Sequence, residues 1–290
     1  MSTRGYLILA QNGNSNDYVR MAYVLALTIK LTQKEVTSVS LVTDVVDAVP
    51  DHYKSVFDHV IEIPWYDDAL ASEWKIENRW KIYHITPYEE TVLLDADMLF
   101  LTNVDNWWSY LNKNYDLFIT SQVLTYRNEI VTGDYYRRAF VENDLPNTYS
   151  AFMYFKKSQL AEEFWTLVEI IAKNWQEFYN KFLLEYKPKN LSMDVVFALA
   201  VKILGIEDQI TSSFNYPTFT HMKSRIQNWH ISTNDWMDYG GVYLNKQGSL
   251  KISNYQQTGI FHYTEKKFLN NHIEYVYEDL YKEKINGSRN

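Results

Sequence analysis

Residues 90–100 read ETVLLDADMLF, in which an apolar run typical of a buried strand leads to Asp95 and Asp97. In extended backbone, alternate residues point to the same side, so we expect both carboxylates to face one point. The small Ala96 between them lets a bound group approach closely. Such a carboxylate pair suits Mg²⁺ or Mn²⁺ bound together with substrate phosphates. The alternative is that both acids end the strand and cap the next turn.

Strand-like and helix-like patterns alternate along the first hundred residues. We expect strands at 6–10, 39–44, 59–63 and 91–94, and helices at 18–31 and 76–85. This alternation predicts an α/β fold with a mostly parallel central sheet flanked by helices. Ligands bind at the carboxyl ends of such strands. The loop 11–17, Asp44 and the acid pair are all expected there.

The second half of the chain has a different pattern. We expect strands at 116–120 and 150–155, one long amphipathic helix at 160–186, and a hairpin at 242–252. A further helix at 192–204 would begin at the N-cap Ser192 and stop at Gly205. No linker separates the halves, so we expect a single domain over residues 1–290.

Composition excludes several classes of protein. The 290 residues include no cysteine, which excludes disulfides, cysteine nucleophiles and cysteine metal sites. A net charge of −8 with scattered lysines argues against non-specific binding of nucleic acid through its phosphates. The sequence has no signal-peptide pattern, and no apolar run approaches the ~20 residues of a membrane span. We therefore expect a cytoplasmic protein.

Several segments resemble glycosyltransferase family 8, the glycogenin and galactosyltransferase group of nucleotide-sugar enzymes. YVRMAYVLAL at 18–27 is similar to the family's first helix, and Arg79 stands where the family carries a lysine or arginine. Residues 85–90 and 103–107 resemble the segments on either side of the acid pair. GIFHY at 259–263 is similar to a late strand that ends in a histidine and an aromatic residue.

The later motifs depart from the family pattern. TEKKF at 264–268 lacks the family's glycine, proline and tryptophan, and Lys267 would stand one position early. The central Asn-Ala-Gly segment appears as SAF at 150–152, and only Asp194 remains of an Asp-Gln-Asp helix start. The resemblance therefore covers residues 6–110 well and the rest in patches.

The resemblance implies a GT-A fold, Rossmann-like, with an elaborated C-terminal acceptor region. The nucleotide-sugar and metal half would be residues 1–120, and the acceptor and lid half 121–290. It also implies a UDP-sugar donor, a Mn²⁺ or Mg²⁺ ion, and retention of the anomeric configuration.

On this resemblance, the metal ligands would be Asp95, Asp97 and His262. Asp97 would bind more directly, while Asp95 would reach the ribose or a metal-bound water. This mixed oxygen and nitrogen set suits Mn²⁺ better than Mg²⁺. His262 is alternatively a strand-end histidine satisfied by hydrogen bonds. The other histidines lack a comparable context and are expected to be structural or surface residues: His52, His59, His84, His221, His230 and His272.

Cationic side chains would bind the diphosphate. Arg79 would make bidentate contacts to phosphate oxygens, and Lys266 or Lys267 would supply a second cation on a mobile C-terminal segment. Each of these side chains is alternatively an ordinary solvated residue.

The nucleoside would lie against the end of the first strand. Ala10, Gln11 and Asn12 would line it through their backbone, Tyr18 would stack on the base, and Asp44 would contact the base or ribose. Tyr18 is alternatively a core aromatic, and Asp44 a strand cap.

Asp194 is the one acid that can be placed near the reactive face of the sugar. It would position the substrate or stabilise an oxocarbenium-like state; an acid favoured by the helix dipole is the alternative. The sequence identifies no nucleophile or general base, and none is required if the leaving phosphate deprotonates the acceptor. Trp229, Trp236 and Tyr239 lie in a polar, loop-like stretch and are candidates for an acceptor platform.

The leading hypothesis is therefore a metal-dependent, retaining glycosyltransferase with an unknown acceptor: a small molecule, a glycan or a protein. A modified DNA base is a less favoured acceptor because of the net charge of −8. A nucleotidyltransferase would more often carry a glycine-rich basic loop after its first strand, whereas 11–17 has one glycine and no basic residue. A non-catalytic sugar-nucleotide binding protein would be expected to lose the acid pair.

Overall fold

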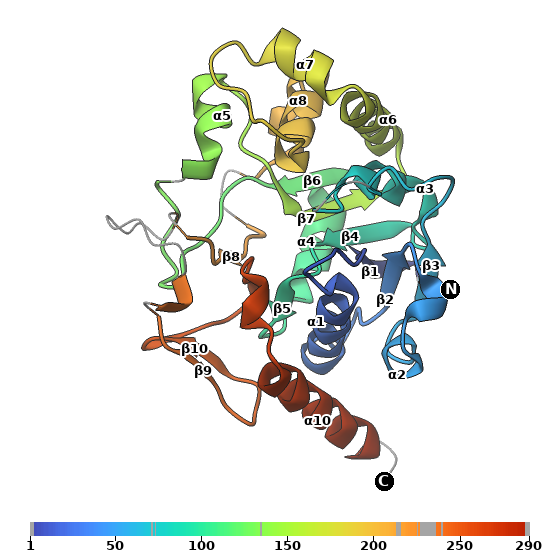
Figure 1. Cartoon of the computed structure of the whole chain (residues 1–290), viewed down its shortest axis with the longest axis vertical. Coiled ribbons are helices and arrows are strands. Elements are labelled where there is room, and N and C mark those ends of the chain that lie inside the picture. Colours follow the sequence, from blue (N-terminus) through green and yellow to red (C-terminus); the bar gives the residue numbers. More distant parts are fainter. Residues whose placement is uncertain are drawn as a thin grey trace.

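The computed structural model describes residues 3–70, 72, 74–133, 135–212, 216–224, 226, 236–238 and 240–287. Its centre is a six-stranded sheet in the order β3-β2-β1-β4-β7-β6 (Figure 1). The strands are β1 (Arg4–Leu9), β2 (Val39–Thr43), β3 (His59–Glu62), β4 (Glu90–Leu94), β6 (Leu117–Thr120) and β7 (Tyr149–Lys156). β7 runs antiparallel to both neighbours, and the other adjacent pairs are parallel. The expected mostly parallel sheet is confirmed.

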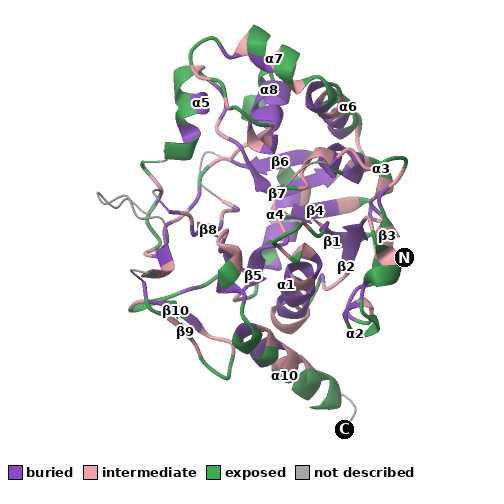
Figure 2. Cartoon of the chain, in the orientation of Figure 1, coloured by how far each residue is buried: buried purple, intermediate pink, exposed green. Residues whose placement is uncertain are grey.

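Helices cover both faces of this sheet because side chains alternate along each strand. Tyr6 and Ile8 of β1 pack in one buried cluster with α1 (Tyr18–Thr32) and α4 (Asn106–Asn114). Leu7 packs in a second cluster with α6 (Gln159–Lys173) and α8 (Met193–Leu204). Figure 2 shows the strands and the inner sides of these helices buried, with exposed residues on the outer helices. The core therefore consists of two apolar layers, one on each face of the sheet.

The C-terminal part of the chain folds back onto the first half. β12 (Ile260–His262) lies between β5 (Met98–Phe100) and β8 (Thr220–His221), and β10 (Leu250–Ile252) lies between β9 (Val242–Leu244) and β11 (Tyr255–Gln256). α10 (Asn271–Gly287) lies beside α1 (Figure 1). An ion pair of 2.6 Å joins Arg20 to Glu274, and the Tyr23 hydroxyl donates to Glu278 at 2.9 Å. These contacts fix the last helix beside the first.

Short elements complete the description. The short helices are α2 (Asp51–Lys54), α3 (Ile82–Ile85), α5 (Arg138–Glu142), α7 (Trp175–Phe182) and α9 (Glu207–Ile210). The 3₁₀ turns are η1 (Val46–Ala48), η2 (Glu77–Lys81), η3 (Tyr135–Arg137), η4 (Trp236–Asp238) and η5 (Lys266–Phe268). Among the described residues, no helix combines the length and the apolar character needed to cross a membrane.

Two expected helices differ from the structure. The single helix expected at 160–186 is wrong, since it breaks at Asn174 into α6 and α7. The Asn174 side chain donates to the Ile170 carbonyl at 2.9 Å, a local hydrogen bond that competes with helix continuation. The helix expected at 76–85 is a 3₁₀ turn, η2, followed by α3.

Other expected elements are confirmed. α8 ends at Gly205, whose φ of 66° is the left-handed conformation that glycine adopts without strain. Ser192 precedes this helix but its side chain makes no capping hydrogen bond. The hairpin expected at 242–252 corresponds to β9 and β10.

Candidate functional site

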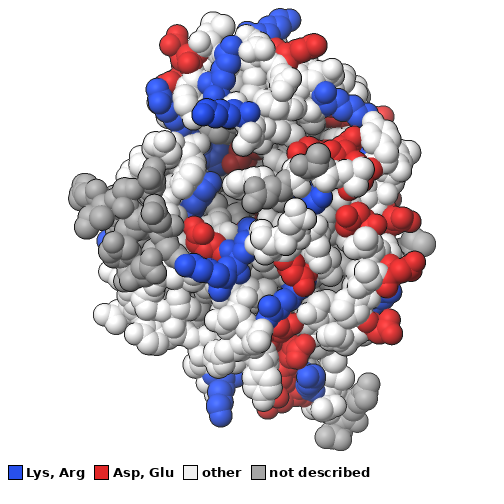
Figure 3. Space-filling model, in the orientation of Figure 1, with Lys and Arg blue, Asp and Glu red and all other residues white. Residues whose placement is uncertain are grey.

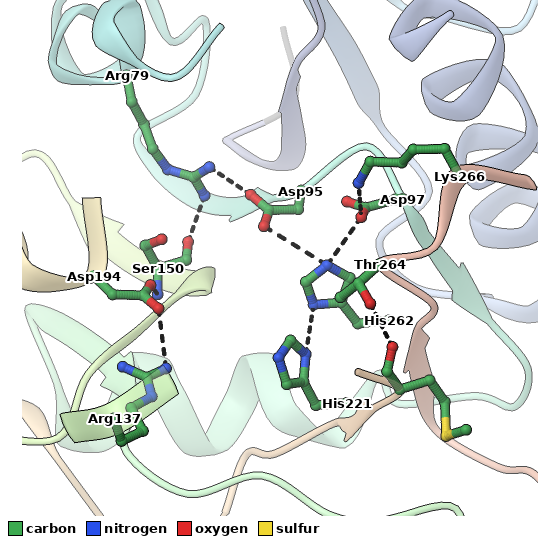
Figure 4. Close-up of polar contacts among 11 residues, drawn as sticks. Arg79, Asp95, Asp97, Arg137, Ser150, Asp194, His221, His262, Thr264 and Lys266 are labelled. Carbon is green, nitrogen blue, oxygen red and sulfur yellow. Dashed lines mark hydrogen bonds and ion pairs between the residues drawn. The ribbon is translucent and has the colours of Figure 1, made fainter. Parts of the chain in front are cut away.

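Asp95 and Asp97 lie in the connection between β4 and β5. The prediction that extended backbone aligns their side chains is wrong, because the chain bends at Ala96 and Asp97. Their carboxylates nevertheless converge on the imidazole of His262, with ligand atoms of all three residues within 4.8 Å of one another (Figure 4). His262 Nε2 is 3.2 Å from Asp97 Oδ2 and 3.9 Å from Asp95 Oδ2. The structure thus assembles the three expected metal ligands.

Strand pairing explains how a residue so distant in sequence reaches the acid pair. β12 is antiparallel to β5, and His262 is the register partner of Met98. The backbone N–H of Tyr263 donates to the Asp97 carbonyl at 3.1 Å and extends the ladder by one residue. The position of His262 is therefore set by main-chain hydrogen bonds.

The residues fit a divalent metal. Two carboxylates and one imidazole form the mixed donor set that Mn²⁺, Mg²⁺ and related ions accept. Asp97 and His262 are each 5% exposed, whereas Asp95 is only partly buried. The site is therefore anchored in the core and open on the side of Asp95.

Lys266 on η5 forms an ion pair with the Asp97 carboxylate (Figure 4). Burial alone would raise the pKa of Asp97, but Lys266 and His262 hold it well below its usual value. Burial would lower the pKa of Lys266, and Asp97 raises it instead. Both groups are therefore charged at neutral pH, and Lys266 contributes the positive charge beside the acid.

Arg79 on η2 contacts Asp95 rather than open space. Its guanidinium donates to Asp95 Oδ1 and to the carbonyl oxygen of Ser150, and its side chain is 7% exposed. These two hydrogen bonds orient the guanidinium. Its expected contact with a diphosphate stays a prediction.

The residues expected to line a nucleotide surround the carboxyl end of β1. Ala10 and Gln11 are buried, and Gln11 Oε1 accepts from the Asn78 amide at 2.7 Å. Asn12 is exposed and accepts from the Val19 N–H at 3.0 Å. Tyr18 is half-buried at the start of α1, and its ring centre lies 5.3 Å from Lys266 Nζ. Tyr18 and Lys266 are therefore neighbours at the edge of the candidate metal site.

Three further candidates lie around this locality. Asp44 directly follows β2 and is partly exposed, and Thr43 Oγ1 donates to its Oδ1 at 3.4 Å. Ala96 is 4% exposed and packs in the hydrophobic cluster on the α1 side of the sheet. Lys267 is exposed on η5, next to Lys266 in the chain. Their expected contacts with nucleotide stay predictions.

Asp194 is in the first turn of α8 and contacts the start of β7. Its Oδ1 accepts from the Ser150 N–H at 2.7 Å, and its Oδ2 pairs with Arg137 at 3.0 Å (Figure 4). Burial alone would raise the pKa of Asp194, but Arg137 and the Ser150 hydrogen bonds lower it. Asp194 is therefore an ionised, oriented carboxylate.

Arg137 and His221 were missed from the sequence. Arg137 carries no motif; it is 7% exposed and lies over the Tyr149 ring at 3.5 Å. His221, expected to be a structural or surface residue, is buried with its Nδ1 3.0 Å from His262 Nδ1, a contact that the sequence did not predict. The pairing of β8 with β12 brings His221 beside His262, and β8 is too short to be recognised as a strand from the sequence.

The expected acceptor platform is wrong for Trp236. This side chain is fully buried, and its Nε1 donates to the Tyr263 carbonyl at 3.3 Å. Trp229 and Tyr239, like His230, lie outside the described residues.

Solved structures with a similar fold include glycosyltransferases. The galactosyltransferase LgtC, in complex with donor and acceptor sugar analogs, is 10% identical with a TM-score of 0.52, covering 96% of this chain and 95% of that chain. The glycosyltransferase GlyE of Streptococcus pneumoniae TIGR4 is 10% identical with a TM-score of 0.51, and the match covers 99% of this chain and 64% of that chain. Mouse xyloside xylosyltransferase 1, apo form, is 12% identical with a TM-score of 0.45, and the match covers 72% of this chain and 84% of that chain.

No protein-family model matches the chain, and no curated protein matches it. The likeness at these identities therefore concerns the fold. The expected GT-A fold is confirmed: this chain has the α/β fold of solved glycosyltransferases such as LgtC and GlyE.

Proposed function

We propose that this protein is a metal-dependent glycosyltransferase that transfers a sugar from a UDP-sugar to an acceptor. The observation that carries the proposal is the convergence of Asp95, Asp97 and His262 within 4.8 Å. They meet beside the carboxyl end of β4, where α/β folds bind their ligands. The structural neighbour LgtC holds donor and acceptor sugar analogs. That neighbour supports a sugar-donor site in this fold.

Asp95, Asp97 and His262 would hold the metal, and the imidazole favours Mn²⁺ over Mg²⁺. When bound, the metal supplies positive charge against the negative charge that builds up on the leaving diphosphate. Arg79 orients Asp95, and the ionised state of Asp97 makes it ready to bind without losing a proton.

Lys266 would provide the second cation. Its ammonium now neutralises Asp97, and it can turn to the diphosphate oxygens when Asp97 engages a metal. Lys267 on the same turn is the alternative. Tyr18, beside Lys266, would stack on the base, while Ala10, Gln11, Asn12 and Asp44 would line the nucleoside.

Asp194 would position the donor sugar or stabilise its positive charge in the transition state. We further propose retention of the anomeric configuration, with the leaving phosphate taking the proton of the acceptor hydroxyl. In this proposal residues 1–120 form most of the donor and metal site. Residues 121–290 hold the acceptor and also supply His262, Lys266 and Asp194 to the donor and metal site. The whole acts as one domain in the cytoplasm.

A glycan, a protein side chain or a small molecule is the favoured acceptor. On the face in Figure 3, the Lys and Arg side chains of the described residues are interspersed with Asp and Glu. The net charge of −8 also opposes tight contact with a polyanion.

The test is a panel of nucleotide sugars with Mn²⁺, in which released nucleoside diphosphate and thermal stabilisation are measured. We expect stabilisation and slow diphosphate release with a UDP-sugar, and loss of both in Asp97→Asn. Asp144→Asn is the matched control, since Asp144 is fully exposed and its ion pair is long, at 3.9 Å. The proposal fails if no nucleotide sugar stabilises the protein and Asp97→Asn behaves like the wild type.

A further inference from the structure

His221 lies against His262, one of the three candidate metal ligands. Their Nδ1 atoms are 3.0 Å apart, and the two ring centres are 4.7 Å apart (Figure 4). The contact is fixed by the fold, since β8 and β12 are parallel neighbours in which His221 and His262 are register partners. The Met222 N–H also donates to the His262 carbonyl at 2.8 Å. The proposed function assigns no role to the second imidazole of this buried pair.

The distance between the two Nδ1 atoms requires one N–H donor and one lone-pair acceptor. His262 Nε2 faces the carboxylates of Asp97 and Asp95, and this nitrogen needs its lone pair to bind a metal. A neutral imidazole with a lone pair on Nε2 carries its proton on Nδ1. With a metal on Nε2, His262 would therefore donate from Nδ1, and His221 would accept at Nδ1 and carry its own proton on Nε2.

The competing tautomer would block the site. A proton on His262 Nε2 would be attracted to Asp97 Oδ2, 3.2 Å away, and would occupy the lone pair that a metal requires. An acceptor at Nδ1 opposes this arrangement. The ring of His221 packs among aromatic side chains, since the ring centres of Tyr149 and Phe219 each lie 5.8 Å from its own.

We propose that His221 is a positioning residue that selects the metal-binding tautomer of His262 and fixes its ring. The inference rests on the proposed function, because it requires a metal at Asp95, Asp97 and His262. Hydrogen-bond partners of metal-ligating histidines orient the ring and raise its basicity, and their loss lowers metal affinity about 10–100-fold.

The experiment measures the Mn²⁺ affinity of the purified protein by calorimetry, with Mn²⁺ alone and with UDP. His221→Leu removes the acceptor and should weaken Mn²⁺ binding about 10–100-fold. His221→Asn places an amide oxygen near the position of Nδ1 and should keep affinity near the wild-type value. Phe219→Leu, in contact with both rings, is the packing control and should also bind like the wild type.

Unchanged affinity in His221→Leu would overturn the inference while leaving the proposed function intact. Equal losses in all three variants would overturn it too, since packing alone would then explain them. A wild type that binds no Mn²⁺ would contradict the proposed function itself. Circular dichroism in EDTA tests whether His221→Leu folds. If it does not fold, ¹⁵N-histidine NMR spectra of the wild type with Mg²⁺ replace it. A proton on Nε2 of His221 would support the inference, and a proton on Nδ1 would overturn it.

Discussion

The backbone N–H of Ser150 donates to the carboxylate of Asp194 at 2.7 Å. The carbonyl oxygen of the same residue accepts from Arg79, whose guanidinium also holds Asp95. One residue at the start of β7 therefore connects an acid of the candidate metal site with the acid expected near the sugar. The Ser150 backbone therefore orients the Asp194 side chain directly and the Asp95 side chain through Arg79.

Arg137→Gln tests the support of Asp194. The substitution leaves a partly buried carboxylate without its cation, and we expect a loss of about 2 kcal/mol in the free energy of unfolding. Arg137→Lys should recover only part of this, because it loses the planar contact with Tyr149. Urea unfolding measures both.

Arg138→Gln is the matched control for this prediction. Arg138 is the neighbouring arginine, exposed and paired with Glu142 one helical turn away. Its loss should change stability much less than the loss of Arg137, because an exposed ion pair is screened by water. Equal effects of Arg137→Gln and Arg138→Gln would refute a special role for the Arg137–Asp194 pair.

The lowered pKa of Asp194 predicts how its stabilising effect depends on pH. A carboxyl group whose pKa is lower in the folded state stabilises the protein above its unfolded-state pKa, about 3.9. That contribution is lost as pH falls through the lower, folded-state pKa. We therefore expect the stability difference between wild type and Asp194→Asn to be constant near neutrality and to shrink below about pH 4. A difference that grows on acidification would contradict this assignment.

Lys266→Met should separate metal binding from nucleotide binding. Without the ammonium at Asp97, Mn²⁺ alone should bind more tightly, because a like charge has been removed. UDP should bind more weakly in the presence of Mn²⁺, because the second cation is absent. Calorimetric titration with Mn²⁺ alone, and then with UDP in the presence of Mn²⁺, measures the expected gain in Mn²⁺ affinity and the expected loss of UDP affinity.

Lys267→Met provides the comparison, since Lys267 is exposed on the same 3₁₀ turn. It should leave Mn²⁺ affinity unchanged. If UDP affinity falls more in Lys267→Met than in Lys266→Met, the second cation is Lys267.

Gly205→Ala tests the end of α8, the helix that carries Asp194. A Cβ added at Gly205 would meet no atom within 4 Å, but the φ of 66° disfavours alanine, so the cost is one of backbone conformation alone. We expect a loss of about 1 kcal/mol in unfolding free energy. Gly287→Ala, also in open space but without a left-handed φ, should be neutral, and both are measured by urea unfolding.

The sequence predicted the central sheet and the clustering of Asp95, Asp97 and His262 better than the other contacts of the site. β1, β2 and β4 are nearly continuous apolar runs, which is how strands buried on both faces read. The acid pair follows such a run, and His262 ends another. Those features are local, and a local pattern is sufficient to recognise them.

The remaining contacts depend on pairing between distant segments. β5 and β8 are too short to stand out by periodicity, and without them neither the bend at Ala96 and Asp97 nor the place of His221 can be inferred. Arg137 on η3 pairs with Asp194 on α8, which is distant in the sequence. Trp236 is buried beside Phe261 and Phe268 although its flanking sequence is polar. Charge and aromatic content alone do not determine such contacts.

The pairing of β12 with β5 has a consequence for biosynthesis. His262 reaches the acid pair only through that strand, so a chain still emerging from the ribosome has both aspartates but lacks their third ligand. Domains are completed as units once their chain is available. Metal capture should therefore be among the last events in the maturation of this protein, and a tightly bound ion would report that the C-terminal strand has docked.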